Sequence, residues 1–460
     1  MYKLLLVNPR SKGRSTGLGA YKSTSIAPLA LAYLAALTPD HYDVRIIDEN
    51  IEPMDFSDVD IVGITSYTAR IQRAYEISEA FTSREIPVVM GGIHVSMLPD
   101  EALQYCSSVV MGEAEGVWGD VLADFEKKSL KPKYEGMPYN LKDLPRPARS
   151  LFKNDKYLWD SILTSKGCPM DCSFCSVTRF NGRKFRRRPV DQVIDELATI
   201  KNKFVWILDD NLLGYDEVEW LTEFFNKIIE KKIKKYFFAQ VSMSFGENEE
   251  IVKLAHKAGI RLVVVGIESI DVECLKGYNK NLNANYAVQD LYMAKLQTIR
   301  RGGVGILGCF ILGADGDHLE SFGKTLDFIQ HAHIDVLQLS KPTPLPGTRF
   351  YEMLDKDGRI IDKNYPAAWK DYKFTRMLFK PEHLSLEDVY EGFYYVKKIY
   401  YSLPQRLRRI LFTLRDTKSL STTVISMLYD HTYMKSWKNS EIFKEHNMKR
   451  LHRKFSADSR

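Results

Sequence analysis

Short apolar runs, separated by longer stretches of mixed polarity, mark residues 1–130. The apolar runs occupy residues 2–7, 42–47, 60–65, 86–90 and 108–111. Between them, residues 26–37, 70–82 and 99–105 have the apolar or amphipathic character of helices. Strands that alternate with helices at this spacing predict an α/β fold with a parallel, doubly wound sheet of the flavodoxin-like, Rossmann type. Ligands of such sheets bind beyond the carboxyl ends of the strands.

A second alternation follows residues 131–155, which are rich in Lys and Pro and predict a linker. Its apolar runs occupy residues 162–164, 204–208, 236–241, 261–267, 304–312 and 335–339. These strand–helix units, within residues 156–350, predict a partial, open (βα)6 barrel, in which functional residues collect at the carboxyl ends of the strands. The remaining residues, 351–460, predict a helical and basic C-terminal region.

The composition is typical of a protein with buried cores and no membrane span. The chain has 460 residues, 45% of them hydrophobic. No apolar run reaches the about 18 residues that a membrane span needs. Six cysteines and no targeting segment predict a reducing, cytoplasmic location. The net charge of +6 lies in residues 401–460, which hold 13 Lys/Arg and 5 Asp/Glu, so the rest of the chain is close to neutral.

Three cysteines fall close together just after the first apolar run of the second alternation. Their spacing is C-x3-C-x2-C, at Cys168, Cys172 and Cys175. Three thiolates on one loop can bind three irons of a cubane cluster and leave the fourth iron open to a ligand, whereas a four-cysteine cluster is closed. An odd number of cysteines disfavours a disulfide set, and a zinc site usually has four ligands. Buried core thiols are expected at the isolated Cys106, Cys274 and Cys309.

The three-cysteine motif resembles that of the radical S-adenosylmethionine enzymes, and Phe174, just before the third cysteine, also fits their pattern. The resemblance covers about residues 155–350. It implies a [4Fe–4S] cluster whose open iron chelates the amino and carboxylate groups of S-adenosylmethionine. It also implies an external electron donor of the flavodoxin or ferredoxin type, and cleavage of the sulfonium to a 5′-deoxyadenosyl radical.

Polar residues at the ends of three barrel strands are candidates to bind S-adenosylmethionine. Asp209 and Asp210 follow the second strand, where buried acids must meet hydrogen-bond donors. The resemblance implies that this place binds the amino group, with Asp209 as the first choice, and a simple Asx turn is the alternative. Gln240 and Ser242 alternate at the end of the third strand. For Glu268, at the end of the fourth, the resemblance implies a carboxylate that accepts two ribose hydroxyls.

The N-terminal sheet, placed before such a core, resembles the cobalamin-binding domain of one large subfamily of these enzymes. Two loops carry the resemblance, Gly-Gly-x-His after the fourth strand and Gly-Glu-Ala-Glu after the fifth. Candidate cobalamin contacts are Ser66, Gly91, Gly92, His94, Gly112 and Glu113. The paired glycines would let the backbone approach a bulky ligand closely. His94 can ligate cobalt or form a hydrogen bond to backbone or a ligand tail, and the second role is the expected one.

One stretch departs from the cobalamin-binding pattern. Many such domains carry D-x-H-x-x-G after the second strand, and the histidine ligates cobalt from below. Here residues 48–53 read DENIEP, with neither His nor Gly. A histidine ligand at this place is therefore excluded, and the lower face of a bound cobalamin is expected to be open or covered by another side chain. The alternative is a flavodoxin-like domain that binds no cobalamin.

Two basic segments leave a structural and a functional interpretation open. Residues 183–188 read RKFRRR and either bind an anionic group or form a solvated face. The C-terminal region, with the amphipathic residues 406–415, forms either a helical cap on the barrel or a substrate lid that touches anionic membrane lipid. Basic patches interleaved with aromatic residues do not occur in the core, so no nucleic-acid partner is expected.

Together these features predict a cobalamin-dependent radical S-adenosylmethionine methyltransferase that acts on an unactivated carbon of a lipid or small natural product. The resemblance implies that one S-adenosylmethionine supplies the methyl group and a second yields the radical. A cobalamin-dependent cyclase, oxidase or carbon–carbon bond-forming enzyme without methyl transfer is the first alternative. A cobalamin-binding sensor with a structural cluster is the second. The expected location is cytoplasmic or peripheral to a membrane.

Overall fold

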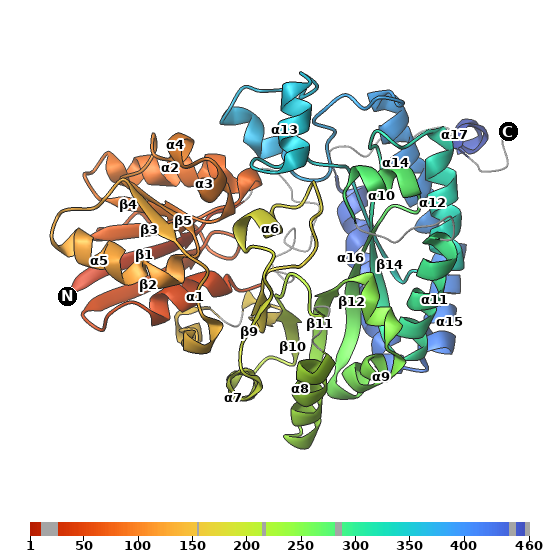
Figure 1. Ribbon diagram of the computed structural model, residues 1–460, viewed down its shortest axis with the longest axis horizontal. Helices are drawn as coiled ribbons and strands as arrows, with labels where there is room; N and C mark the ends of the chain where they lie inside the picture. Colours follow the sequence, from red (N-terminus) through yellow and green to blue (C-terminus); the bar gives the residue numbers. More distant parts are fainter. Residues whose placement is uncertain (11–25, 154–155, 214–217, 281–287, 441–447, 456–460) are drawn as a thin grey trace. The chain divides into compact units, whose positions relative to one another are not determined.

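The computed structural model describes residues 1–10, 26–153, 156–213, 218–280, 288–440 and 448–455. The chain forms two compact units, both α/β, and the chain passes between them several times (Figure 1). Unit 1 consists of Met1–Cys168, Phe174–Pro189 and Pro344–Lys373. Unit 2 consists of Pro169–Ser173, Val190–Thr343 and Phe374–Arg460. The domain boundaries near residues 130, 155 and 350 stay predictions.

Parallel strands form the sheet of unit 1 in the order β2-β1-β3-β4-β5-β6. Their bounds are β1 Tyr2–Asn8, β2 Tyr42–Asp48, β3 Ile61–Thr65, β4 Val88–Gly91, β5 Ser108–Gly112 and β6 Lys133–Gly136. The first five lie where apolar runs predicted them, and the runs of β1, β3, β4 and β5 are nearly continuous because both faces of the sheet are buried there. The sixth lies within the segment that was expected to be a linker. Its sequence KYEG is polar, as befits a strand at the edge of a sheet.

Helices cover both faces of this sheet. Their bounds are α1 Leu29–Ala36, α2 Ile71–Thr82, α3 Ile93–Met97, α4 Pro99–Ala102 and α5 Trp118–Glu126. Figure 1 shows α2, α3 and α4 along one face, and residues of α1 and α5 share a core cluster on the other. Short 3-10 helices of unit 1 are η2 Thr68–Arg70, η3 Ala114–Gly116, η4 Leu141–Asp143, η5 Arg149–Leu151 and η8 Ala367–Asp371.

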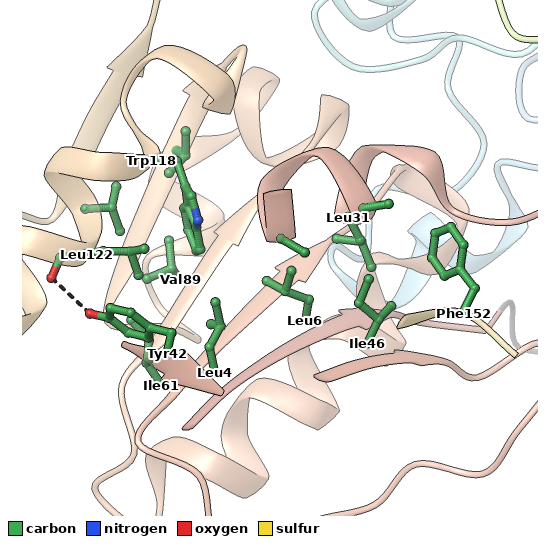
Figure 2. Packing of buried hydrophobic residues seen from close by; sticks show 14 of the residues in the cluster. Leu4, Leu6, Leu31, Tyr42, Ile46, Ile61, Val89, Trp118, Leu122 and Phe152 are labelled. Carbon is green, nitrogen blue, oxygen red and sulfur yellow. Dashed lines mark hydrogen bonds between the residues drawn. The ribbon is translucent and has the colours of Figure 1, made fainter. Parts of the chain in front are cut away.

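Leucine, isoleucine and aromatic side chains fill the space between the sheet and the face covered by α1 and α5. Figure 2 shows Leu4 and Leu6 of β1 on the face of the sheet where Leu31 and Trp118 also lie. Each such side chain contributes about 1.5–3 kcal/mol when it leaves water. Polar atoms inside the cluster are paired: the Trp118 indole N–H donates to Thr38 Oγ1 over 2.9 Å. This packing fixes the edge of the sheet that holds the candidate cobalamin loops.

The remaining elements of unit 1 surround the cysteine motif and add a late segment of the chain. They are β7 Asp160–Ile162, the antiparallel pair β8 Ser165–Lys166 and β9 Arg186–Arg187, α6 Val177–Phe180, and α13 Arg349–Lys356. The segment 344–373, which holds α13 and η8, belongs to unit 1 although the preceding part of that unit ends at Pro189. Its aromatic residues pack in this unit, as described below for Trp369.

Five parallel strands of unit 2 follow the order β14-β13-β12-β11-β10. Their bounds are β10 Phe204–Ile207, β11 Tyr236–Val241, β12 Ile260–Glu268, β13 Gly305–Ile311 and β14 Val336–Ser340. The helices that alternate with them are α7 Val190–Thr199, α8 Val218–Glu230, α9 Glu249–Ala258, α10 Val272–Gly277, α11 Val288–Arg301 and α12 Leu319–His331, with the 3-10 helix η7 Met243–Glu247. The α/β character of this part of the chain is therefore confirmed.

The predicted helical C-terminal region is also confirmed. Its helices are α14 Leu386–Tyr400, α15 Leu403–Thr417, α16 Leu420–Lys438 and α17 Met448–Phe455. Phe310 of β13 meets Phe328 of α12 at a ring distance of 6.3 Å. Phe238 of β11 stacks on Tyr429 of α16 at 5.0 Å, and a Cβ at Gly305 would lie 2.5 Å from Ser426 Oγ. Since Gly305 and Phe310 point to opposite faces of β13, α16 covers the face of the sheet opposite to α12.

Candidate active site

The three predicted cluster cysteines lie on the loop between β8 and α6. Cys168, Cys172 and Cys175 are partly exposed and form no disulfide. Gly167 precedes the first of them with a φ of +92°, and a Cβ there would lie 2.4 Å from the carbonyl oxygen of Lys184. Only glycine fits this turn without displacement of the backbone. The Cys168 N–H donates to the Gly182 carbonyl over 3.3 Å, which closes the base of the loop.

The middle of the loop belongs to unit 2 and is held by the segment after α10. The Ser173 N–H donates to the Tyr278 carbonyl over 2.8 Å, and its hydroxyl donates to the Gly277 carbonyl over 3.2 Å. The Asn279 side-chain amide donates to the Asp171 carbonyl over 2.8 Å. These three bonds fix the backbone on both sides of the second cysteine, Cys172. The anchoring residues Gly277, Tyr278 and Asn279 lie at the end of α10 and in the turn after it, where no motif singled them out.

The donor set of the loop fits a [4Fe–4S] cluster. In the described part of the chain, no three His, Cys, Asp or Glu side chains gather around a single metal position. A cubane cluster does not need such a position, because each thiolate binds a different iron. Three cysteines on one loop, none of them in a disulfide, match three irons, with the fourth left open. When bound, such a cluster supplies the electron that cleaves S-adenosylmethionine.

Glu113, a candidate cobalamin contact, is buried and paired with cations on both strands that flank the cysteine loop. Its Oε2 accepts a hydrogen bond from Arg186 over 3.0 Å and lies 3.3 Å from Lys166 Nζ. The Tyr139 N–H also donates to it over 2.9 Å. Burial alone would raise the pKa of Glu113, but the Arg186 hydrogen bond and the Lys166 charge hold it below its ordinary value. Glu113 is therefore an anion that links the end of β5 to β8 and β9.

The basic run at residues 183–188 is largely used inside the protein. Arg188 is 2% exposed, and its guanidinium donates to the Leu163 carbonyl over 2.9 Å. Arg187 donates to Thr164 Oγ1 over 2.9 Å, and Arg186 is the partner of Glu113 described above. These contacts favour the structural interpretation of the run over that of an open anion-binding face.

The candidate S-adenosylmethionine residues at the ends of β10 and β11 are tied to each other. Asp209 is buried and Asp210 is partly exposed. The Gln240 amide donates to the Asp209 carbonyl over 3.2 Å, and the Ser242 N–H donates to Asn211 Oδ1 over 3.0 Å. The structure thus brings four of the candidates to adjacent carboxyl ends of strands. Their contacts with S-adenosylmethionine stay predictions, and Asn211 is a further polar group at this place that sequence reasoning passed over.

Glu268 ends β12 in a strained conformation. Its φ is +65°, a value that residues with side chains rarely adopt. A conformation of this kind costs on the order of 1–3 kcal/mol and tends to occur at functional sites. Its Oε1 lies 3.2 Å from Lys280 Nζ, which also donates to the Gly266 carbonyl. Lys280 was not singled out from the sequence, because no motif marks a lysine in a connecting turn.

Glycines let the loops of the candidate cobalamin edge approach one another. Gly92 has a φ of +98°, and a Cβ there would lie 2.6 Å from the Ser66 carbonyl oxygen. The Ser66 N–H donates to the Gly91 carbonyl over 3.0 Å. At Gly112, with a φ of +74°, a Cβ would lie 2.2 Å from the Gly136 carbonyl oxygen. These glycines therefore let their own backbone approach the neighbouring backbone at Ser66 and Gly136. Their contacts with cobalamin stay predictions.

His94 is buried and uses both ring nitrogens within unit 1. Nε2 lies 3.2 Å from Glu101 Oε1, and Nδ1 lies 3.2 Å from Thr68 Oγ1. Glu101 also accepts from the Trp369 indole over 2.9 Å and from the Tyr75 hydroxyl over 2.7 Å. Burial lowers the pKa of His94, although Glu101 opposes this, so a neutral ring donates from Nε2 and accepts at Nδ1. This arrangement favours a hydrogen-bonding role over cobalt ligation.

Asp48, at the carboxyl end of β2, is hydrogen-bonded within unit 1. Asp48 is buried, where many cobalamin domains begin their histidine motif, and accepts from Asn8 Nδ2 over 3.0 Å, Asn50 N–H over 3.0 Å and Tyr157 over 3.1 Å. The loop after β2 is thus ordered without a histidine. When bound at such an edge, cobalamin carries a methyl group between donor and acceptor.

Comparison with known families accounts for both units. Residues 162–329 match the radical SAM superfamily, and residues 17–122 match the B12 binding domain. Bacteriochlorophyllide d C-12(1)-methyltransferase of Chlorobaculum tepidum is 31% identical over 427 residues, which cover 89% of each chain. Hopanoid C-2 methylase of Rhodopseudomonas palustris is 27% identical over 82% of this chain and 76% of that protein.

A solved structure has the same fold over nearly the whole chain. The cobalamin-dependent S-adenosylmethionine radical enzyme OxsB, with aqua-cobalamin and S-adenosylmethionine bound, matches with a TM-score of 0.67 at 16% identity. The match covers 98% of this chain and 78% of that one. The three-cysteine loop, the two α/β sheets and the similarity to these relatives all indicate the same family. The chain belongs to the radical S-adenosylmethionine enzymes with a B12-binding domain, a family of cobalamin-dependent methyltransferases that use a [4Fe–4S] cluster.

Proposed function

We propose that this enzyme transfers a methyl group to an unactivated carbon of a largely hydrophobic substrate, either a lipid or a small natural product. The observation that carries the proposal is the 31% identity to a bacteriochlorophyllide methyltransferase over 89% of each chain. A hopanoid methylase, 27% identical, supports a lipid as the acceptor. Both relatives are named for methyl transfer, and they match this chain on both the B12-binding and the radical SAM parts.

In this proposal the residues of the chain divide the work between the units. Cys168, Cys172 and Cys175 hold the cluster. Asp209 and Glu268, at the carboxyl ends of β10 and β12, orient S-adenosylmethionine through its amino group and ribose. The loops at Gly91–His94 and Gly112–Glu113 hold the corrinoid, with His94 in a hydrogen-bonding role. An external flavodoxin- or ferredoxin-type protein supplies electrons, and no nucleic acid takes part.

The test uses the full chain, reconstituted without oxygen with iron, sulfide and hydroxocobalamin. Bacteriochlorophyllide d and a hopanoid are offered with S-adenosylmethionine that carries a deuterated methyl group. The expected result is formation of both S-adenosylhomocysteine and 5′-deoxyadenosine, with a product that has gained the labelled methyl. A substrate-dependent product without the label would contradict methyl transfer and favour a cyclase or oxidase, the activity named for a relative that is 21% identical. Loaded protein that yields neither coproduct would favour a sensor.

Cys172→Ala gives the matched control for the cluster. We expect it to lose iron and to form no 5′-deoxyadenosine, because a cubane with two protein thiolates is not retained. Cys106 is also partly exposed, and burial raises the pKa of its thiol to about 12. Because Cys106 lies outside the cluster loop, Cys106→Ala should keep both iron and turnover. Cleavage of S-adenosylmethionine by Cys172→Ala at the rate of the unchanged protein would refute the central assignment.

We further propose that the enzyme works at the periphery of a membrane, where lipid-soluble acceptors are found. No helix in the described part of the chain is both long and apolar enough to cross a bilayer. The hydrophobic acceptors named for two relatives support this location.

A further inference from the structure

The outer surface of α15 and α16 carries eight apolar side chains that the fold leaves exposed. Their exposed fractions run from 38% to 71%, and we call this set the leucine surface: Leu403, Leu407, Leu411 and Leu414 on α15, and Leu420, Val424, Met427 and Leu428 on α16. Spacings of three and four residues place each set on one stripe of its helix. The two helices pack against each other, so the two stripes belong to one hairpin.

The buried face of α16 is mixed in polarity, with Ile425, Tyr429 and Met434 beside its hydroxyls, and its exposed face carries a further apolar stripe. Its buried face carries hydroxyls: Thr422 Oγ1 donates to the Gly303 carbonyl over 2.8 Å, and Ser426 lies against Gly305. Its exposed face carries Leu420, Val424 and Leu428. Soluble helices normally bury their apolar stripe. Packing within unit 2 therefore does not account for the leucine surface, and exposed apolar patches of this kind mark surfaces that bind a partner or a membrane.

Every carboxylate of the hairpin is already neutralised by a cation. Between residues 403 and 438 the acids are Asp416 and Asp430 alone. Asp430 is 7% exposed and accepts from Arg406 over 3.1 Å and Arg409 over 2.7 Å. Asp416 lies 3.1 Å from Arg300 Nε and 2.9 Å from His333 Nδ1, with Arg415 as a third partner. The exposed charge of the hairpin is consequently positive.

Exposed cations lie on the same two helices and the turn between them. Arg408 and Lys418 are exposed, and the side chain of Arg415 is 60% exposed. Each basic residue near an anionic bilayer contributes about 1 kcal/mol of attraction. Helices that lie in a bilayer interface combine a leucine-rich face with Lys and Arg around it. The hairpin has both features.

We propose that the leucine surface is a membrane-docking face, which inserts its apolar side chains into the headgroup region of an anionic bilayer while Arg408, Arg415 and Lys418 contact the lipid phosphates. This inference extends the peripheral location proposed above, but it does not rest on methyl transfer. Docking between two copies of the chain is disfavoured, because it would bring the same cations together without an exposed carboxylate from residues 403–438 to pair with them.

The experiment measures flotation of the reconstituted full chain with vesicles of phosphatidylcholine alone and of phosphatidylcholine mixed with phosphatidylglycerol. We expect tighter binding to the anionic vesicles, weakened by added salt. Leu407→Ser combined with Leu411→Ser should weaken binding at least about tenfold, because two leucines no longer leave water. Leu291→Ser combined with Leu386→Ser is the matched control, since these leucines are 45% and 37% exposed on other helices.

A second pair of variants tests the charges. Arg408→Gln combined with Lys418→Gln should remove most of the preference for anionic vesicles and keep the weaker binding to phosphatidylcholine. No flotation with either vesicle, or equal binding by the Leu407 and control pairs, would overturn the proposal. A dimer in sedimentation velocity that the Leu407 pair dissociates, with no vesicle binding, would assign the surface to self-association instead. Vesicle binding by protein without methyl-transfer activity would leave this inference standing while the proposed function fails.

Discussion

Glu268 combines three properties that seldom occur together in a residue with no functional role. It ends a buried strand, its φ of +65° is strained, and its carboxylate has a lysine, Lys280, at 3.2 Å. The register between β12 and β13 shifts between Gly266 and Glu268, which turns the carboxylate out of the regular strand. Strain of this kind persists only where the surrounding structure imposes it. The local geometry therefore supports the role in ribose binding that its position in the sequence predicts.

Glu268→Gln should weaken the binding of S-adenosylmethionine about tenfold or more. The amide keeps the shape of the side chain but loses the charge, and a hydrogen bond to a charged group is worth about 1.5–3 kcal/mol. Equilibrium dialysis of the reconstituted protein under anaerobic conditions measures the dissociation constant. Glu273→Gln, an exposed acid on α10, is the control and should leave it unchanged. Equal affinity in the two variants would exclude Glu268 from the site.

Some residues of the candidate site could be located from the sequence because they end a predicted strand, and others could be located only from the structure. The places of Asp209 and Glu268 at strand ends could be predicted because the two residues follow apolar runs, while their roles stay predictions. Trp369 could not, because its partner Glu101 lies 268 residues away in the chain. Lys280 and Asn211 are polar residues in turns, a setting in which such residues are common without any role. The role of His94 depended on these partners, so sequence alone left two roles open.

Gly92→Ala is expected to destabilise the loop after β4 by about 1–3 kcal/mol, since its backbone is left-handed and its Cβ would lie 2.6 Å from the Ser66 carbonyl oxygen. Gly91→Ala is the matched control, because a Cβ there would make only ordinary contacts with Val110, to its carbonyl oxygen at 3.6 Å and its Cβ at 3.8 Å. Urea denaturation of the apoprotein measures the free energy of unfolding, and corrinoid content measures the consequence for the loop. Equal losses in the two variants would show that the backbone conformation is not the cause.

The turn between β13 and α12 contains a buried acid whose ionisation is linked to stability. Asp317 accepts from the Gly313 N–H over 2.8 Å and the Ala314 N–H over 3.0 Å, and it lies 3.6 Å from Cys274 Sγ. Burial raises the pKa of Asp317 from 3.8 to about 6, although the backbone N–H groups oppose the rise. The folded protein therefore holds this proton more tightly than the unfolded chain.

Stability should consequently fall as the pH rises from about 4 to about 6, because in that window only the unfolded chain has lost the Asp317 proton. The penalty then stays constant at higher pH, at about 3 kcal/mol for a pKa difference of about two. Asp317→Asn should remove this decline, so its advantage in unfolding free energy over the unchanged protein should grow between pH 4 and pH 7. Asp315→Asn, in the same turn, is the control. A constant difference across this pH range would contradict the linkage.

Among whole elements, apolar periodicity predicted the buried strands and missed the marginal ones. The five predicted N-terminal strands and the five strands of unit 2 lie within a few residues of their expected places, because most of them are largely apolar runs. Helix α3 is only five residues long, and β6 is a polar edge strand, so neither leaves a periodic signal. Helix α16 misleads for another reason, since it carries apolar residues on both faces: Ile425, Tyr429 and Met434 are buried, and Leu420, Val424 and Leu428 are exposed.

At the scale of the molecule, sequence order is a poor guide to what folds together. The change from one alternation to the next placed the two α/β parts correctly, because hydrophobic patterns are local. It gave no sign that Pro344–Lys373 completes unit 1. In that segment the Trp369 indole donates to Glu101 over 2.9 Å and packs edge-on to His94 at 5.3 Å. Gly347 lies so close to Met97 that a Cβ would come within 2.4 Å of its sulfur.

A fragment of residues 1–189 should therefore be less stable than the same fragment joined through a flexible Gly/Ser linker to residues 344–373. Without the late segment, Glu101 loses the Trp369 donor and His94 loses its aromatic cover, and an unsatisfied buried group costs about 1–3 kcal/mol, more when it is charged. Urea denaturation followed by circular dichroism compares the two fragments. Introducing Trp369→Phe into the joined fragment removes the indole N–H and one of the two fused rings, so it should reproduce part of the loss of stability. If the joined and unjoined fragments unfold at the same urea concentration, the late segment adds nothing to unit 1, and a contiguous N-terminal domain would be the correct description of the chain.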